Sequence, residues 1–174
     1  SGNYQPTLDP ADFVAVIDNP HLPFPDGATW RYEGMSDGER EVIEVVVTGE
    51  RTEIMGISAT VVRDTVTVGG KLVEDTFDWY AQDADGNVWY LGEDVKDYEE
   101  GKVVSTAGSW RAGVDGALPG IVMPGDPQAG AAYRRAAEAS PRMVEAWWGL
   151  YAAQVHLEDR AGARSSLVKI LSIL

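Results

Sequence analysis

Acidic and aromatic residues alternate in the stretch DTFDWYAQDADGNVWYLGED, residues 75–94, in a pattern that suits either a sugar- or calcium-binding loop or a β-hairpin. An EF-hand calcium loop has twelve residues and ends in a bidentate Glu, whereas strand-forming residues follow here directly after Asn87. Asp83 and Asp85 are also ordinary turn formers, because their side chains accept hydrogen bonds from nearby backbone. The stretch therefore predicts a hairpin with its turn at residues 83–87.

This turn determines which side chains of the hairpin share a face. The expected cross-strand pairs are Ala81 with Trp89, Tyr80 with Tyr90, and Trp79 with Leu91. One face then carries Phe77, Trp79, Ala81, Trp89 and Leu91, and the other carries Asp78, Tyr80, Gln82, Val88 and Tyr90. The first face predicts a core patch, and the second leaves Asp78, Tyr80 and Tyr90, together with Tyr32, as the expected ligand-binding residues.

In the preceding hairpin, two further acids could lie opposite each other. A two-residue turn at Gly69 and Gly70 would put Asp64 directly opposite Asp75, on the face that carries Phe77. Two carboxylates so placed repel each other unless they share a proton, bind a cation or lie at an open rim. Asp64 and Asp75 are therefore the candidate metal ligands, for a divalent cation. The alternative, which we favour, is a bulge or a one-residue change of register that sends one of the two aspartates to solvent.

Other residue types point to little chemistry. His21 and His156 lie in different parts of the chain without a second ligand nearby, and the serines lie in no nucleophile-elbow sequence. No set of residues suggests catalytic roles, so we expect no catalytic residues, and no cofactor unless Asp64 and Asp75 bind a cation. The enzymatic alternative is a metal-dependent hydrolase that uses these two aspartates.

Alternating segments joined by Gly-containing turns dominate residues 28–115. Val, Ile, Thr and aromatic residues alternate with polar ones, and the turns are SDGE, VGGK, ADGN and EEGK. The expected fold is α+β and mainly β: an antiparallel meander over 28–115 that forms a curled sheet or open barrel, after an extended segment at 1–27. An uncovered edge of such a sheet would invite association between copies.

The chain changes character near residue 128. Lys and Arg minus acids gives 8 − 24 = −16 for residues 1–128 and 6 − 4 = +2 for residues 129–174. Residues 116–130, GALPGIVMPGDPQAG, indicate a linker, and residues 131–174 have the helical period of two amphipathic helices. This helical hairpin resembles roughly one and a half tetratricopeptide units, because similar residues recur after 34 positions.

The overall composition excludes several classes of binding partner and site. A net charge of −14 argues against nucleic acid, and no apolar run is long enough to span a membrane. The absence of Cys excludes disulfides and thiolate metal sites. The first residues, SGNYQPTLDP, begin without Met and are typical of a trimmed start, so the native N-terminus is left open.

Three segments together resemble an uncharacterised family of bacterial exported or lipoprotein-type β domains. They are DFVAVIDNPHLPFPDGATWRYEG (12–34), residues 75–94, and GSWRAGVDGALPGIVMPGDP (108–127), so that the resemblance spans residues 12–127. It implies a secreted, periplasmic or cell-surface domain and supplies no catalytic residues. The helical tail departs from the family, whose members continue with further strands.

These observations predict a non-catalytic, extracytoplasmic binding or envelope-associated module. Its ligand would be a small molecule or a protein, held on the concave side of the sheet. Besides the hydrolase, the remaining alternative is a protein-interaction module that acts through the helical tail.

Overall fold

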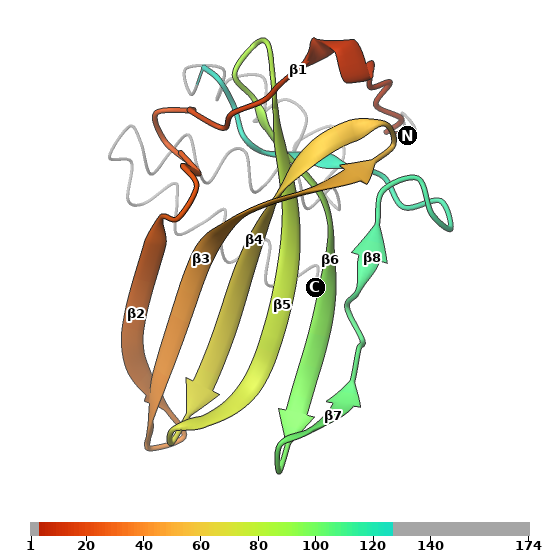
Figure 1. Cartoon of the computed structure of the whole chain (residues 1–174). Helices are drawn as coiled ribbons and strands as arrows, with labels where there is room; N and C mark the ends of the chain where they lie inside the picture. Colours follow the sequence, from red (N-terminus) through yellow and green to blue (C-terminus); the bar gives the residue numbers. More distant parts are fainter. Residues whose placement is uncertain (1–3, 127–174) are drawn as a thin grey trace.

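The computed structural model describes residues 4–126, which form an antiparallel sheet (Figure 1). The strands β2 to β6 follow one another along the sheet in chain order, as expected for a meander. The elements are η1 (Pro10–Asp12), β1 (Phe13–Val14), β2 (Thr29–Ser36), β3 (Glu39–Ile54), β4 (Ile57–Val68), β5 (Lys71–Asp83), β6 (Val88–Glu99), β7 (Lys102–Ser105), β8 (Trp110–Arg111) and β9 (Gly120–Met123).

Tight turns with positive φ connect the strands. The two-residue turns are Asp37–Gly38, Met55–Gly56, Gly69–Gly70 and Glu100–Gly101, and every one of these residues has φ between 49° and 85°. Positive φ at both central positions is the type I′ geometry, whose twist matches that of paired strands. The turn between β5 and β6 is longer and has Gly86 at φ 84°, so all four turns that the sequence predicts are confirmed.

Two register shifts change the predicted pairs. A shift after Val66 pairs Asp64 with Thr76 and Asp75 with Thr65, so the two aspartates are not opposed and the favoured alternative of a changed register is confirmed. Its second part is wrong, because neither aspartate is sent to solvent: Asp75 is 8% exposed and Asp64 Oδ1 is buried. The second shift lies beside Trp79, which pairs with Gly92 rather than with Leu91. The predicted pairs Tyr80 with Tyr90 and Ala81 with Trp89 are confirmed. Each shift accommodates one extra residue in one strand, which is the geometry of a β-bulge.

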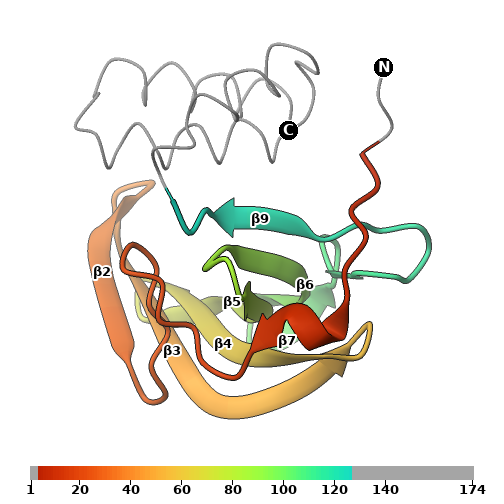
Figure 2. The same ribbon diagram turned by 90° about the horizontal axis from the view of Figure 1, so that it is seen from above.

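The sheet is curled and does not close. Seen from above, its strands follow a curved path from β2 to β9, and β9 turns back over the concave side (Figure 2). The outer side of β6 is covered in succession by β7, β8 and β9, which pair with its end, middle and beginning. Strand β9 lies within residues 116–130, so this segment is in part a strand and not only a linker.

Each face of the sheet carries its own apolar cluster. The first consists of Ile54, Ile57, Ala59, Ala81, Trp89, Leu91 and Ala112, with Trp79 and Phe13 packed against it. The second, on the concave face, consists of Ile17, Phe24, Val47, Val62 and Val88, with Trp30 and Tyr80 against it. Trp79, Ala81, Trp89 and Leu91 thus share one core, as the alternation predicts. Phe77, expected in the same patch, lies outside this cluster, with Arg63 and Lys96 over its ring.

The N-terminal segment is bound to the sheet by buried amides. Gln82 Oε1 accepts hydrogen bonds from the backbone N–H groups of Asp18 and Asn19, at 3.0 and 2.8 Å. Asn19 Nδ2 donates to the carbonyls of Gly86 and Pro124, at 2.8 and 3.0 Å. The N-terminal segment was expected to be only extended, but it completes the core. Its attachment to the sheet buries the side chains of Ile17 and Phe24 in the second cluster.

The predicted helical hairpin at 131–174, with its tetratricopeptide resemblance, lies outside the described residues, as does His156. Over residues 4–126, no helix has the length and apolar character that a membrane span requires.

Candidate functional site

Four carboxylates lie on the concave face of the sheet; we call them the carboxylate face. They are Asp64 on β4, Glu74 and Asp78 on β5, and Glu93 on β6. The register places them together: Asp78 lies directly opposite Glu93, and Asp64 lies opposite Thr76, between Glu74 and Asp78. Because side chains alternate along a strand, residues paired in this way point to the same side of the sheet.

Two stacked tyrosines border these acids. The rings of Tyr80 and Tyr90 lie 4.9 Å apart at an interplanar angle of 23°, and the Tyr90 hydroxyl donates a 2.5 Å hydrogen bond to Asp78 Oδ1. Phe24 packs against Tyr80, with ring centroids 5.0 Å apart. Tyr80 is thereby part of the core and acts as a platform that positions Tyr90.

The environment changes the protonation of Asp78. Burial raises the pKa of this carboxyl from 3.8 to about 7, although the hydrogen bond from Tyr90 lowers it. The neighbouring carboxylates Glu93, Asp64 and Glu74 raise it further by charge repulsion. Asp78 therefore exchanges a proton near neutral pH, a property that is concentrated at binding and catalytic sites.

Asp64 lacks compensation of its charge. Its Oδ1 is buried and has no hydrogen-bond partner, and burial, followed by repulsion from Glu74, raises the pKa of this carboxyl. None of the ion pairs among residues 4–126 involves a member of the carboxylate face. Buried carboxylates without a cation cost free energy, which a positively charged group placed among them would recover.

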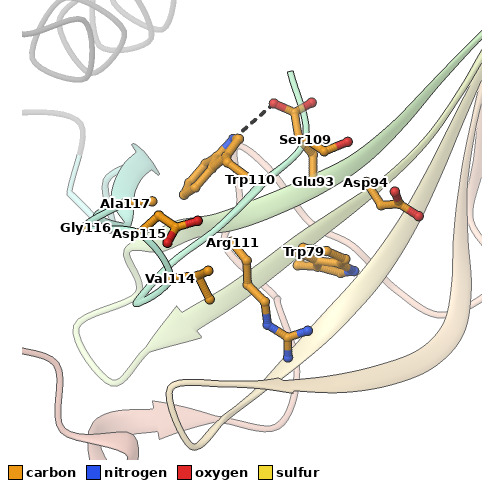
Figure 3. A pocket seen from close by; sticks show the side chains of 10 residues that line it. All are labelled: Trp79, Glu93, Asp94, Ser109, Trp110, Arg111, Val114, Asp115, Gly116 and Ala117. Atoms are coloured by element: carbon orange, nitrogen blue, oxygen red, sulfur yellow. Dashed lines mark hydrogen bonds between the residues drawn. The ribbon is translucent and has the colours of Figure 1, made fainter. Parts of the chain in front are cut away.

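Glu93 and Trp110 form the edge of this site. The indole Nε1 of Trp110 donates a 3.0 Å hydrogen bond to Glu93 Oε1, and its ring meets Tyr90 edge-on at 5.3 Å. Beyond them an open cavity of about 620 Å³ lies along β6 and β8 (Figure 3). Its lining includes Trp79, Glu93, Asp94, Trp110, Arg111 and Asp115.

Arg111 does not neutralise the acids around this cavity. Its guanidinium lies over the ring of Trp79, at 5.5 Å from the centroid, and donates a hydrogen bond to the carbonyl of Glu53. Figure 3 shows it extending away from Glu93. On the walls of the cavity Arg111 thus covers the indole of Trp79, and Lys96 pairs with Asp94. Among the described residues no ion pair involves the other two lining carboxylates, Glu93 and Asp115.

The predicted ligand-binding residues are brought together only in part. Asp78, Tyr80 and Tyr90 form one cluster, but Tyr80 is packed beneath Phe24. Tyr32 points to the same side of the sheet from the outer strand β2, where it is 56% exposed. It lies three strands from Asp78 and cannot belong to the same small site.

The predicted metal pair is not formed. Asp64 and Asp75 point to opposite sides of the sheet, because the register shift moves Asp75 by one residue. Asp75 instead accepts two hydrogen bonds from Arg63, at 2.7 and 2.9 Å. Within residues 4–126 no group of three or more His, Asp or Glu side chains is placed to hold a metal ion.

The turn at 83–87 is occupied by local hydrogen bonds. Asp83 Oδ1 accepts the N–H groups of Asp85 and Asn87, and its Oδ2 accepts the indole N–H of Trp89 at 2.7 Å. These bonds hold the hairpin together and confirm the interpretation of Asp83 as a turn former, whereas Asp85 takes part through its backbone N–H.

Sequence reasoning missed Glu93, Glu74 and Trp110. By the register expected for an unbroken hairpin, Glu93 would face Phe77 on the opposite side of the sheet. The bulge at Leu91 brings it opposite Asp78. A signal was present in Gly92, since a glycine within a strand often marks a bulge or a close approach of backbone.

Comparisons with protein-family models, with curated proteins and with solved structures found no match for this chain.

Proposed function

We propose that the protein is a non-catalytic binding module whose carboxylate face takes an organic cation, either an amine or a guanidinium group. The observation that carries this proposal is the set of partly buried acids at Asp64, Asp78 and Glu93, of which none has a cationic partner among the described residues. A bound cation would supply the missing charge, and Tyr90 and Trp110 would offer it aromatic surface.

The cations of the described sheet lie elsewhere. Arg63 and Lys96 point to the opposite side, where each lies 5.6 Å from the ring centroid of Phe77 and pairs with Asp75 or Asp94. This separation leaves one side with compensated charge and the other with uncompensated negative charge. It supports a ligand of positive charge, such as a small amine or a Lys or Arg side chain of a polypeptide.

We further propose that the module works outside the cytoplasm, secreted or associated with the envelope. The support is the resemblance of residues 12–34, 75–94 and 108–127 to exported domains. Protease digestion of cells that express the full-length protein, before and after the outer envelope is opened, tests this location: protection that persists until the inner membrane is lysed would overturn it.

Calorimetric titration tests the binding proposal. Diaminobutane and arginine methyl ester should bind, whereas butanediol, which is neutral and of similar length, should not. Because a cation favours the ionised form of Asp78, binding should release protons below about pH 7 and strengthen as the pH rises through this value.

A pair of matched variants makes this test specific. Asp78→Asn combined with Glu93→Gln should weaken binding of both amines at least about tenfold, since two charges next to the ligand are lost. Asp85→Asn combined with Glu50→Gln makes the same change of net charge at exposed positions and should leave binding unchanged. Equal weakening by both pairs, or no binding of either amine, would refute the proposal.

A further inference from the structure

The two edges of the sheet are protected to different extents. On one side β6 is followed by β7, β8 and β9, which are short and separated by loops. On the other side β2 runs without interruption from Thr29 to Ser36 and forms the outer strand (Figure 1). A long and regular edge strand is a template for pairing with another strand.

The outward-facing groups of β2 can be identified from its pairing with β3. Ser36 and Glu39 flank a two-residue turn and therefore form a hydrogen-bonded pair, as do the alternate pairs that follow. The even-numbered residues of β2 direct their backbone groups to β3. The N–H and C=O groups of Thr29, Arg31, Glu33 and Met35 consequently point away from the sheet.

The charges along β2 are complementary to those of a second, antiparallel copy of the same strand. Arg31 and Glu33 are both exposed, point to the same side and pair with each other along the strand, and Glu33 also pairs with Arg40. If a second β2 runs antiparallel beside the first, with Tyr32 opposite Tyr32, then Arg31 of each copy faces Glu33 of the other. Sliding the second strand by two residues in either direction would instead oppose Arg31 with Arg31 or Glu33 with Glu33, which is unfavourable.

The neighbouring positions fit the same register. Trp30 would face Gly34 of the second copy, where space is open, since a Cβ at Gly34 would meet only Glu41 Oε2, at 4.0 Å. Thr29 would face Met35, which is 69% exposed, and the two Tyr32 side chains, each 56% exposed, would meet at the two-fold axis. Every cross-strand pair between the two copies thus either joins opposite charges or brings apolar surface together.

We propose that the protein forms a symmetric homodimer through β2, in the antiparallel register that places Tyr32 opposite Tyr32 and Arg31 opposite Glu33. The two sheets would continue into each other and present both concave faces on the same side. This inference rests on the edge strand alone and does not depend on the binding of a cation.

Sedimentation equilibrium of the full chain over a range of concentrations tests the dimer. The mass should approach twice 18.8 kDa at high concentration. Arg31→Glu, and separately Glu33→Arg, should weaken dimerisation at least about tenfold, because each creates two like-charge pairs across the axis. The double variant Arg31→Glu/Glu33→Arg restores opposite charges and should restore the dimer.

A matched control lies at the opposite edge. Lys102→Glu makes the same change of charge as Arg31→Glu on the exposed start of β7, and it should leave the dimer intact. Circular dichroism of each variant distinguishes loss of dimer from loss of fold. A chain that stays monomeric at every concentration, or a double variant that folds but fails to dimerise, would overturn the proposal.

Cross-linking reads the register directly, because the chain contains no Cys. Tyr32→Cys places two thiols opposite each other and should form an intermolecular disulfide on mild oxidation. Met35→Cys should not, since it faces Thr29 in this register. A disulfide formed through Met35→Cys in preference to Tyr32→Cys would refute the register.

Discussion

Asp78 and Glu93 lie directly opposite each other on β5 and β6, and neither forms an ion pair with a cation of residues 4–126. Like charges in directly opposed positions destabilise a sheet. The Tyr90 hydroxyl and the Trp110 indole each donate one hydrogen bond to this pair, which compensates part of the cost. The arrangement is a strained feature in an otherwise well-paired sheet, and it makes the stability of the protein sensitive to pH.

Replacing Asp78 with Asn should remove much of this sensitivity. The folded state retains the proton on Asp78 up to about pH 7, whereas the unfolded chain loses it near 3.8. Between these values the folded state binds more protons, so this group makes the free energy of unfolding fall as the pH rises, by up to about 4 kcal/mol. Urea denaturation at about pH 5 and about pH 8 measures the difference. Asp78→Asn should flatten it, and Asp85→Asn should not.

Removing the Tyr90 hydroxyl should increase the pH dependence of the free energy of unfolding, whereas Asp78→Asn reduces it. In Tyr90→Phe the carboxylate of Asp78 loses its hydrogen-bond donor, so the pKa of Asp78 rises further and ionisation becomes more costly. We expect a loss of roughly 1–3 kcal/mol at about pH 8 and a smaller loss at about pH 5. Tyr32→Phe is the control, since Tyr32 is exposed. Equal losses at both pH values would contradict the assignment.

Gly92 should be intolerant of any side chain. It has φ 138°, and an added Cβ would lie 2.4 Å from the carbonyl oxygen of Trp110 and 2.9 Å from Arg111 Cα. Gly92→Ala should therefore cost about 3 kcal/mol or more, by pushing β8 away from β6. Gly101→Ala provides the comparison, because Gly101 also has positive φ but nothing lies within 4 Å of its added Cβ. Thermal melts that show equal losses would refute the close approach of β8.

Arg63 should matter more than an ordinary surface arginine. Its side chain is 46% exposed, but that of its partner Asp75 is only 11% exposed, so Arg63→Met leaves a buried carboxylate without its cation. Solvent screening limits the expected loss to roughly 1–2 kcal/mol. The variant Arg63→Met/Asp75→Asn should recover part of it. A double variant less stable than Arg63→Met would contradict this account.

The order of the strands could be predicted because it depends on local signals. Gly38, Gly70, Gly86 and Gly101 supply the conformations that their turns need, and the segments between them alternate. The turn at Met55 and Gly56 was missed, since Met at positive φ has no clear sequence signature. The assignment of Trp79 and Trp89 to one core needed only alternation and one correct turn.

Local sequence signals could not predict which residues come together in the candidate site. A β-bulge changes every pair beyond it, and the energy that selects its position comes from packing across three or more strands. The shift after Val66 separates Asp64 from Asp75, and the shift beside Trp79 brings Glu93 to Asp78. Both results depend on a single residue of register, which local sequence does not specify.

The amide of Asn19 has a consequence for the order in which the protein assembles. Its two acceptors, the carbonyls of Gly86 and Pro124, lie 67 and 105 residues further along the chain. During synthesis, which proceeds from the N-terminus, the bond to Gly86 can form only after residue 86 has left the ribosome, and the bond to Pro124 only after nearly all of the described chain has done so. Ile17 and Phe24 then wait with it, exposed to the cell. Within residues 4–126 these two core side chains are thus synthesised early and buried late, since Val47, Val62 and Val88 of the same cluster follow them in the chain.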